Sequence, residues 1–285
     1  MKLGGYVLHR NNRDTLEPCL RGLLALCDDV VALDSGATDG SAELVRSLGA
    51  RSVPHAWRGY GAARETAVNA LAPCDYVFFL DSDEHLEPEA VETLRAWRAT
   101  SPTAAVYRLP RRDWAELGAR RFRYRTQWRA RLVRKDKAVW RPEQIVHEAL
   151  PKLAGGRVHA FIEHRFATSV EYRAVKEDRY ALLWALRAHA EQRGLKPVGV
   201  QRLASWARDC LLKGALWRGG AAASRLAWAV AGYHATKYAY LRELRQGRYP
   251  ELTRLYAEGR YDALFERVRD GATRIEEVTP APASR

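Results

Sequence analysis

The sequence predicts an α/β fold with a Rossmann-like, mostly parallel sheet, helices on both faces of that sheet, and a C-terminal helical region. Strand-like and helix-like segments alternate over the first 110 residues, which is the pattern of a parallel sheet. Residues 76–80 are all apolar and have the length of a strand buried on both faces. Beyond residue 168 the apolar residues recur with helical spacing.

Turn and capping signals set the order of the N-terminal elements. Asp14-x-x-Glu17 resembles a capping box at the start of a helix. Gly49 is suited to the left-handed position just after a helix, and Pro88 to the first helical turn. We therefore expect strands at 3–8, 30–33, 51–57, 76–80 and 104–109, and helices at 14–27, 42–48, 62–71 and from 88 onward.

The pattern changes after Pro110. Residues 127–134 alternate apolar and basic side chains, which predicts a half-buried strand with a basic outer face, and 157–162 is a further expected strand. Thr168-x-x-Glu171 resembles a capping box that opens a long helix ending near Gly194. We divide the chain into a catalytic domain at 1–165, a basic, aromatic-rich helical region at 166–275, which includes one or two helices at 200–245, and a disordered tail at 276–285.

The net charge of +13 is unevenly distributed. Residues 1–110 hold 11 Lys/Arg and 15 Asp/Glu, a balance of −4, so residues 111–285 hold the other 36 basic and 19 acidic residues, a balance of +17. Such a basic C-terminal part favours an anionic partner, and its interleaved Trp and Tyr residues favour peripheral contact with a membrane surface. About half of these aromatics are equally well explained as core residues.

Other features of the sequence limit the class of protein to which the chain can belong. The four cysteines lack metal-ligand or redox spacing, which favours reduced thiols and a cytoplasmic location. No leader peptide is expected before the first strand. The most apolar stretch, 219–241, is interrupted by Arg225, His234 and Lys237, so no transmembrane helix is expected. The sequence has no G-x-S-x-G, Walker A or Cys/His zinc pattern, which argues against the common serine hydrolases, P-loop enzymes and zinc modules.

An acidic cluster, Asp81, Asp83 and Glu84, follows the apolar strand at 76–80. Ligands of open α/β sheets bind at the carboxyl ends of the strands, and hard divalent cations prefer oxygen ligands. We therefore interpret Asp81-x-Asp83 as a metal and diphosphate site. A solvated acidic turn that caps the next helix is the alternative, and is the more frequent explanation of an isolated pair of this kind.

Four further positions are candidates for chemistry. Asp34 ends the second expected strand, where a carboxylate can accept from a nucleoside, while Thr38 or Asp39 caps the next helix. Arg64 follows a glycine-containing turn and is suited to a nucleotide or its diphosphate, although a surface arginine is about equally expected. Glu148, after His147, is a candidate general base, but such a Glu is more often at the surface. His164 is more often a structural histidine than a ligand.

In order and spacing these segments resemble family 2 glycosyltransferases of the GT-A fold, and most closely the bacterial branch with lipopolysaccharide-core β-glucosyltransferases. The matching segments are Asn11-Asn12, "DSGATDG" (34–40), "GYGAAR" (59–64), "FLDSDEHLEPE" (79–89), "VHE" (146–148) and the basic-aromatic C-terminal helices. The likeness covers roughly residues 1–245. Glu65, Ala37 and residues 9–12 depart from the usual pattern of that branch, and these departures bear on the identity of the donor.

The resemblance implies a nucleotide-sugar donor, of which a UDP-linked sugar is the expected form, and a divalent cation, Mg²⁺ or Mn²⁺. It places Asn11 and Asp34 at the nucleotide, Asp81 near the ribose or metal, and Asp83 on the metal and diphosphate. It also gives Glu148 the role of base.

These roles imply an inverting transfer to a lipid-linked or lipopolysaccharide-core acceptor. The cation would neutralise charge on the departing nucleoside diphosphate, and Glu148 would deprotonate the acceptor hydroxyl. Glu143 and Asp113 are the next candidates for that base. Arg129 and Arg131 are candidates for holding phosphates, with a solvated basic strand face as the alternative.

Two other classes of function are weighed against this one. A sugar-nucleotide nucleotidyltransferase also uses a parallel sheet and acidic metal sites, but the first strand lacks the glycine-rich basic loop that such enzymes use on a triphosphate. A nucleic-acid-binding module at 111–245 would explain the arginines and aromatics at 120–131. It leaves the acidic cluster unexplained, so we expect no nucleic-acid partner.

Overall fold

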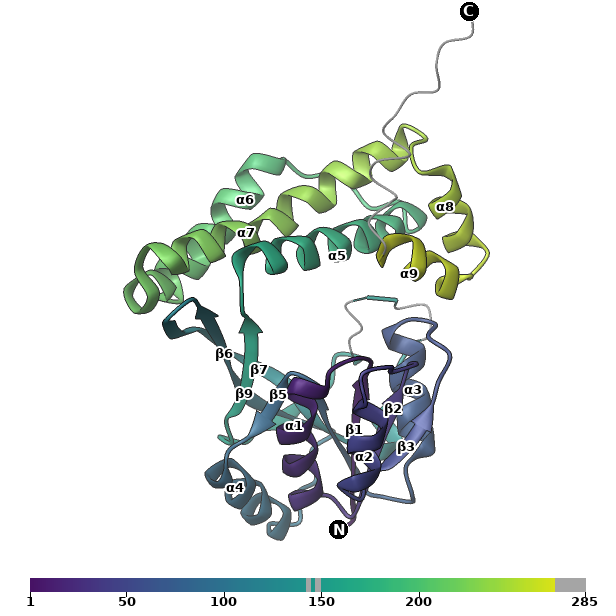
Figure 1. Ribbon diagram of the computed structural model, residues 1–285, viewed down its shortest axis with the longest axis vertical. Helices are drawn as coiled ribbons and strands as arrows, with labels where there is room; N and C mark the ends of the chain where they lie inside the picture. Colours follow the sequence, from purple (N-terminus) through teal and green to yellow (C-terminus); the bar gives the residue numbers. More distant parts are fainter. Residues whose placement is uncertain (142–144, 147–149, 270–285) are drawn as a thin grey trace, which may run out of the picture. The chain divides into compact units, whose positions relative to one another are not determined.

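The structure is a computed structural model that describes residues 1–141, 145–146 and 150–269. The described residues form two compact units. The first contains the described residues up to Thr168 except Ile145 and Val146, and the second contains those two residues and the described residues from Ser169 onward. Every strand of the described chain lies in the first unit, and the second is helical (Figure 1). The tail expected at 276–285 lies outside the described residues.

The first unit alternates strands and helices as far as its fourth strand (Figure 1). Its elements are β1 (Leu3–His9), α1 (Arg13–Leu26), β2 (Asp29–Asp34), α2 (Ser41–Ser47), β3 (Arg51–Pro54), α3 (Tyr60–Ala70), β4 (Tyr76–Asp81), β5 (Glu84–Leu86), α4 (Pro88–Ala99), β6 (Val106–Leu117), β7 (Arg120–Arg134), a 3₁₀ turn (Lys135–Lys137), β8 (Gly155–Arg157) and β9 (Ile162–Ala167). The second unit contains α5 (Val170–Ala190), α6 (Val198–Ala207), a π-helical turn (Arg208–Leu212), α7 (Ala215–Arg245), α8 (Pro250–Ala257) and α9 (Tyr261–Arg269).

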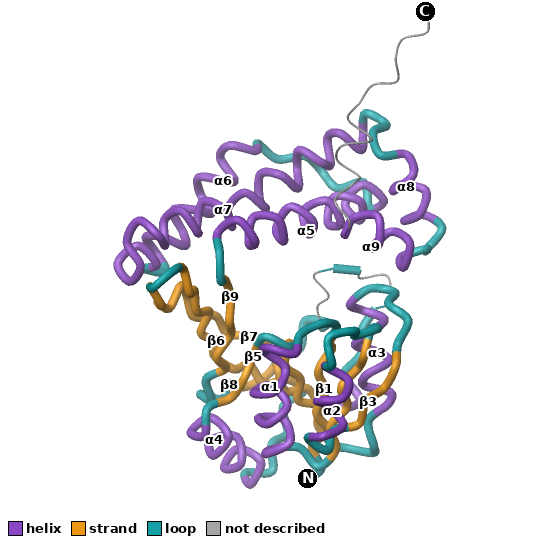
Figure 2. Tube along the Cα trace, in the orientation of Figure 1, coloured by secondary structure: helices purple, strands orange, loops and turns teal. Residues whose placement is uncertain are grey.

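The nine strands of the described chain form one mixed sheet, in the order β3-β2-β1-β4-β7-β6-β9-β5, with β8 beside β6 (Figure 2). Strands β3, β2, β1 and β4 are parallel, whereas β7 runs antiparallel to β4. The register pairs His9 with Asp34 and Leu8 with Asp81. The expected α/β class with a largely parallel sheet is confirmed, and the carboxylates that end β2 and β4 lie at the same edge.

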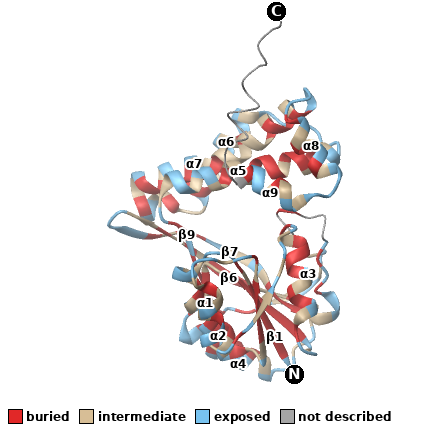
Figure 3. Ribbon diagram, turned by 45° about the vertical axis from the view of Figure 1, so that its right-hand side comes forward, coloured by how far each residue is buried: buried red, intermediate tan, exposed pale blue. Residues whose placement is uncertain are grey.

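Both faces of the sheet are covered, as expected. Phe78 belongs to a core cluster that includes side chains of α1 and α4, and the next residue, Phe79, belongs to a cluster that includes side chains of α3. Successive residues of a strand point to opposite faces, so residues 76–80 of β4 must all be apolar. The strands at the centre of the sheet are accordingly drawn mostly as buried in Figure 3.

The structure corrects several expected boundaries. Strands β6 and β7 are longer than expected because they form one hairpin, closed at Gly118, whose φ of 61° suits glycine. The strand expected at 157–162 is wrong: those residues join the end of β8 to the start of β9. Helix α1 begins after Asn12, with Asp14 in its first turn. Helix α5 is capped by Ser169 rather than Thr168, since the Ser169 side chain accepts from the Tyr172 backbone N–H at 2.9 Å.

The helical unit is built mainly on α5 and α7. The longer of these, α7, is interrupted at Gly220, whose φ of 55° and ψ of −139° are not helical. The apolar faces of both helices supply most of the buried residues of this unit. Among the described residues no helix combines the length and the apolar character that crossing a bilayer requires.

Candidate functional site

The acidic cluster lies where β4 turns into β5. Asp81 ends β4, Ser82 and Asp83 form the turn, and Glu84 opens β5. The three carboxylates differ in their surroundings: the side chain of Glu84 is fully buried, whereas 37% of the Asp81 side chain and 27% of the Asp83 side chain are exposed. The cluster therefore divides into a structural acid and two acids that reach solvent.

Glu84 is held by two buried arginines. Its Oε1 accepts from Arg111 Nη1 at 2.9 Å, and its Oε2 accepts from Arg131 Nε at 3.0 Å. Its Oε2 also accepts from the Asp81 backbone N–H at 3.1 Å. A buried carboxylate is tolerated only when it is paired and hydrogen-bonded in this way. Glu84 thus fixes the shape of the turn that presents Asp83.

Asp81 lies between two guanidinium groups from different elements. Its Oδ1 accepts from Arg64 Nη2 on α3, and its Oδ2 accepts from Arg131 Nη2 on β7, both at 2.8 Å. Phe79 stacks against both arginines, with its ring centroid 5.0 Å from Arg64 Cζ and 5.1 Å from Arg131 Cζ. Desolvation raises the pKa of Asp81, but Arg131 and Arg64 outweigh it and hold that pKa well below its ordinary value.

A row of charged side chains crosses four neighbouring strands on one face of the sheet. The register places Glu84 opposite His164, His164 opposite Asp113, and Asp113 opposite Arg125. Directly opposite residues share a face, so these side chains meet. Arg125 Nε donates to Asp113 Oδ2 at 2.7 Å, and Arg111 Nε lies 2.8 Å from Asp113 Oδ1. Asp113 is fully buried and engaged by two arginines and His164, which argues against its use as a base.

His164 connects this row to Asp83. Its Nδ1 lies 2.7 Å from Asp113 Oδ1, and its Nε2 lies 3.5 Å from Asp83 Oδ2. Desolvation and Arg111 lower the pKa of His164, but Asp83 and Asp113 outweigh them and raise it. The position between the two carboxylates therefore favours a positive charge. Both Asp83 and His164 line a cavity of about 160 Å³ in this unit.

A divalent cation can take the place of the His164 proton that faces Asp83, bound by Asp83 and the neutral imidazole. Metal-bound histidines in proteins usually anchor their second ring nitrogen on a carboxylate, as Asp113 does here for His164. Within the described residues no group of three or more His, Cys, Asp and Glu side chains is arranged to hold a metal ion. A cation at Asp83 and His164 would thus depend on oxygen atoms of a ligand to complete its shell, as Mg²⁺ does with substrate phosphates.

The arginines in the interior of the site are already paired with carboxylates before any ligand is present. Four carboxylates (Asp81, Asp83, Glu84 and Asp113) meet four guanidinium groups (Arg64, Arg111, Arg125 and Arg131). A diphosphate at this edge would therefore add negative charge that these eight groups do not neutralise. A divalent cation and a further basic side chain would supply the missing positive charge.

Arg129 is that further basic side chain. It lies on β7, opposite Leu109 of β6 and two residues before Arg131, and its side chain reaches solvent. Desolvation, Arg111 and Arg131 lower its pKa to about 10, so the guanidinium stays charged near neutral pH. In the described part of the chain it forms no ion pair, and it is therefore available to an anion.

The turn after β2 holds two of the expected nucleotide-binding residues. Asp34 Oδ1 accepts from the backbone N–H groups of Gly36, at 3.0 Å, and Ala37, at 2.8 Å. Asn11 Oδ1 accepts from the Thr38 backbone N–H at 2.7 Å, which ties the end of β1 to this turn. The N-cap residue of α2 is Gly40 rather than Thr38 or Asp39, and Asp39, just before it, accepts from the Ser41 backbone N–H through Oδ1 at 3.0 Å. The nucleotide-binding roles of Asn11 and Asp34 remain predictions.

The expected base falls outside this geometry. Glu148, Glu143 and His147 lie outside the described residues, so the role of Glu148 remains a prediction. The metal-binding role of Asp81 also remains a prediction, and the structure gives both its oxygens arginine partners. The roles of Asp83, Arg64 and Arg131 remain predictions as well, but the structure brings all of these side chains together with Asp81.

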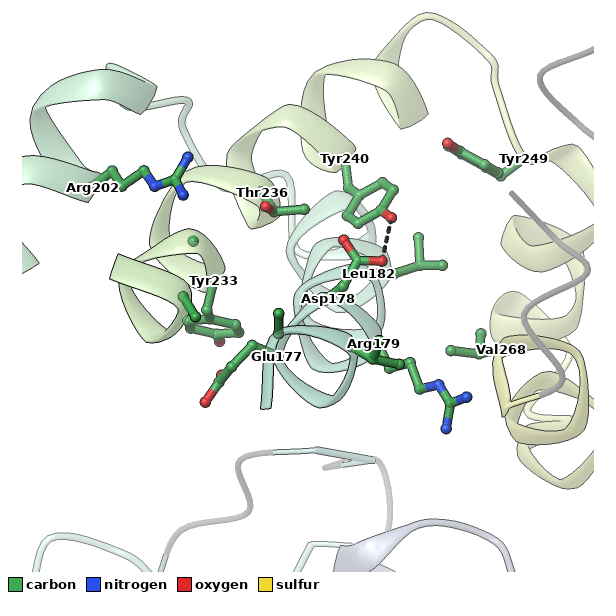
Figure 4. A pocket seen from close by; sticks show the side chains of 14 residues that line it. Glu177, Asp178, Arg179, Leu182, Arg202, Tyr233, Thr236, Tyr240, Tyr249 and Val268 are labelled. Atoms are coloured by element: carbon green, nitrogen blue, oxygen red, sulfur yellow. Dashed lines mark hydrogen bonds between the residues drawn. The ribbon is translucent and has the colours of Figure 1, made fainter. Parts of the chain in front are cut away.

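A larger cavity, of about 450 Å³, lies in the helical unit between α5 and α7. Figure 4 shows Asp178 in its wall, where Oδ2 accepts from the Tyr240 hydroxyl at 2.9 Å. The neighbouring Glu177 pairs with Arg173 at 2.5 Å. The two acidic side chains that line this cavity thus already have partners and do not converge on one point. We therefore place the candidate site at Asp83 rather than in the larger cavity.

Sequence reasoning missed several members of the site. It treated Glu84 only as part of an acidic turn, gave Arg111 and Arg125 no role, and favoured a structural role for His164. The one available signal was the unusual number of charged residues in two segments that otherwise alternate as strands, 106–117 and 120–134. Which of those charges face inward depends on strand register, which the sequence pattern does not specify.

The chain is similar in sequence to known glycosyltransferases. The family model described as "Glycosyl transferase family 2" matches residues 7–165, which is more than half of the chain and includes all the site residues named above. The lipopolysaccharide core biosynthesis glycosyltransferase LpsC of Rhizobium meliloti (strain 1021) is 27% identical over 194 residues, covering 65% of this chain and 71% of LpsC. An uncharacterized glycosyltransferase of Rickettsia bellii (strain RML369-C) is 26% identical over 88 residues, covering 31% of this chain and 30% of that protein.

Solved structures give partial likenesses. Glucosyl-3-phosphoglycerate synthase from Mycobacterium tuberculosis, in complex with Mn²⁺, uridine diphosphate and glucosyl-3-phosphoglycerate, has 23% sequence identity and a TM-score of 0.33, covering 39% of this chain and 44% of that chain. Mannosyl-3-phosphoglycerate synthase from Rubrobacter xylanophilus has 20% identity and a TM-score of 0.35, covering 40% of this chain and 41% of that chain. The chain spans less than half of these solved chains, and likenesses at this level support no conclusion about ligands.

Proposed function

The chain belongs to glycosyl transferase family 2, and we propose that it moves a sugar from a nucleoside-diphosphate sugar to a hydroxyl group of a cell-envelope glycan or glycolipid, with inversion at the anomeric carbon. Membership in the family makes the protein a glycosyltransferase. This assignment argues against the two alternatives, a nucleotidyltransferase and a nucleic-acid-binding module. The name of LpsC supports an acceptor in the lipopolysaccharide core. The donor, the acceptor and the stereochemistry belong to the proposal.

One observation carries the choice of site: Asp83 Oδ2 and His164 Nε2 lie 3.5 Å apart in a cavity, beside buried carboxylates that are already paired with arginines. Asp83 and His164 would hold Mg²⁺ or Mn²⁺, with Asp113 fixing the orientation of the imidazole. The cation, when bound, supplies positive charge against the diphosphate of the donor. Arg129 would contact the same phosphates from the solvent side.

The remaining residues of this edge would position the donor. Asp34, at the end of β2, would accept from the nucleoside, and Asn11 would hold the adjoining turn in place. Asp81 would remain ionised between Arg64 and Arg131, which keeps its carboxylate oriented toward the ribose or the cation. For the acceptor we retain Glu148 as the base that takes the proton of the attacking hydroxyl. A single displacement needs that base and a stabilised leaving group, and no enzyme nucleophile.

The experiment is a thermal-shift screen of the full chain with UDP, GDP, ADP and CDP, each with and without Mn²⁺. A ligand that binds only the folded state stabilises it by mass action, by about 2.7 kcal/mol at a concentration of 100 Kd. We expect one nucleoside diphosphate, with UDP the first candidate, to raise Tm in the presence of Mn²⁺, and Asp83→Asn to remove the Mn²⁺-dependent part of the shift. If none of the four shifts Tm, or if the shift ignores both Mn²⁺ and Asp83→Asn, the proposed site is wrong.

A further inference from the structure

Helices α6 and α7 form an antiparallel hairpin in the helical unit. Trp206 Nε1 on α6 donates to Ser224 Oγ on α7 at 3.2 Å, and Arg202 Cζ lies 4.0 Å from the ring centroid of Trp228. The chain reverses through the π-helical turn and through Gly214, whose φ of 66° suits glycine. We call residues 208–218 the hairpin tip.

The hairpin tip exposes large apolar side chains. Leu212 is 86% exposed, Trp217 is 76% exposed and Leu211 is 46% exposed. Val200 and Leu203 of α6, at 65% and 58%, extend this apolar surface along the helix, because positions 200, 203 and 211 share one helical face. Within the described chain the first unit exposes only two large apolar side chains to a similar degree, Met1 and Val139. A surface of this kind marks a binding site for a partner rather than ordinary solvent-facing structure.

The segment that contains the hairpin tip carries almost only positive charge. Residues 192–242 contain nine Lys/Arg and one acidic residue, Asp209. The Asp209 side chain is only 2% exposed, and its Oδ1 lies 2.9 Å from Arg208 Nε and 3.2 Å from Lys213 Nζ. Asp209 therefore holds two basic side chains in place beside the exposed leucines. With Arg218, which is anchored on the Lys213 carbonyl by a 2.5 Å hydrogen bond, the tip carries three basic groups.

We propose that the hairpin tip docks on the surface of an anionic lipid bilayer. Leu212 and Trp217 would enter the boundary between head groups and acyl chains, and Arg208, Lys213 and Arg218 would meet the lipid phosphates. An aliphatic and indole tip with a basic rim is suited to that interface, where each Lys or Arg near the surface strengthens binding by about fivefold. The tip lies in the plane of the interface, so no spanning helix is required.

The same observations argue against other occupants. Nucleic-acid bases stack on aromatic side chains, but the hairpin tip offers them only Trp217 beside the exposed Leu211 and Leu212, although its positive charges alone would attract a phosphate backbone. A second copy of the chain would bring two positively charged tips together, which like-charge repulsion disfavours. An anionic bilayer is the partner that matches both the apolar and the basic parts of the tip.

Vesicle flotation of the full chain tests this proposal. The vesicles contain phosphatidylcholine alone or phosphatidylcholine with 30% phosphatidylglycerol, at rising salt concentrations. We expect binding to the anionic vesicles at least tenfold stronger than to the neutral ones, and weaker as salt screens the charges. The double variant Leu212→Ser/Trp217→Ser should lower binding at least tenfold, and Arg218→Gln should lower it severalfold.

Two controls make the outcome decisive. The variant Val139→Ser/Tyr172→Ser removes side chains that are 58% and 61% exposed outside the hairpin, and should bind vesicles as the wild type does. All variants should keep the wild-type Tm and the wild-type shift with nucleotide and Mn²⁺, because the hairpin tip and Asp83 belong to different compact units. Absence of vesicle binding at low salt, or binding that survives Leu212→Ser/Trp217→Ser, would overturn the proposal. It would also be overturned if that variant abolished self-association, measured by light scattering, while vesicle binding persisted.

Discussion

His164 Nδ1 lies 2.7 Å from Asp113 Oδ1, and this contact sets the direction of the other ring nitrogen toward Asp83. The two residues are neighbours because β9 pairs with β6, and Asp113 is itself fixed by Arg111 and Arg125. The buried carboxylate of Asp113, the imidazole of His164 and the partly exposed carboxylate of Asp83 therefore form a line from the interior of the sheet to the cavity. This order is the basis of the metal site that we propose.

His164→Gln tests the second ligand of that site. We expect the Mn²⁺ concentration needed for half of the thermal shift with nucleotide to rise at least tenfold, because removal of groups that support a bound metal typically costs 10–100-fold in affinity. His85→Gln is the matched control, since His85 lines the same cavity but pairs with Glu87 at 3.2 Å. Equal Mn²⁺ dependence in the wild type and His164→Gln would remove His164 from the site.

Glu84→Ala tests the buried ion pairs under the turn. The change leaves Arg111 and Arg131 without their shared carboxylate, so we expect the free energy of unfolding in urea to fall by roughly 3–5 kcal/mol. The control, Glu92→Ala, breaks the ion pair between Glu92 and Arg95, whose side chains are 68% and 53% exposed respectively. It should change the free energy of unfolding by less than about 1 kcal/mol. Similar losses in the two variants would mean that Glu84 does not support the fold as described.

Arg129→Ala tests the basic side chain that forms no ion pair in the described part of the chain. Loss of one charge-assisted hydrogen bond to phosphate should raise KM for the donor about tenfold, with kcat much less affected, because the contact serves binding. Stability should change by less than about 0.5 kcal/mol, since the side chain reaches solvent. Arg120→Ala, at the exposed far end of the same strand, is the control and should leave KM unchanged. An unchanged KM in Arg129→Ala would argue that donor phosphates bind elsewhere.

Glu148→Gln tests the proposed base, which lies outside the described residues. A base acts on the proton of the acceptor hydroxyl in the transition state, so kcat should fall at least 100-fold while donor KM changes little. The measurement is initial-rate kinetics with varied donor and saturating acceptor. Near-normal kcat would move the role of base to another residue.

His9→Leu tests a buried histidine at the end of β1. His9 is 3% exposed, and neither ring nitrogen has a hydrogen-bond partner in the described structure. Desolvation lowers its pKa in the folded protein, although Asp34 and Asp39 oppose the shift. As pH falls below about 6.5, the unfolded chain takes up the proton first, so the protein loses stability until pH passes below the folded pKa.

The unfolding free energy should therefore fall less steeply between pH 7.5 and 5.5 in His9→Leu than in the wild type. Parallel pH profiles for the wild type and His9→Leu would show that His9 stays neutral or is equally protonated in both states.

The sequence by itself determined the fold class and the edge at which the site lies. The apolar run before Asp81 and the alternation of strands and helices require a sheet buried on both faces, and parallel strands bring Asp34 and Asp81 to one edge whatever the packing details. The helical periodicity after Ser169 likewise fixed a separate all-helical segment. These features are local, since they depend on the spacing of apolar residues along the chain.

Only the tertiary structure decided which charges face each other. Glu84 and Asp83 are adjacent in the sequence, yet one is buried under two arginines and the other opens to a cavity. His164 lies beside Asp83 because β5 pairs antiparallel with β9, and a shift of one residue in that register would turn His164 to the opposite face. Register across strands results from the packing of the whole sheet, so the pairs that neutralise buried charges become known only when that sheet is assembled.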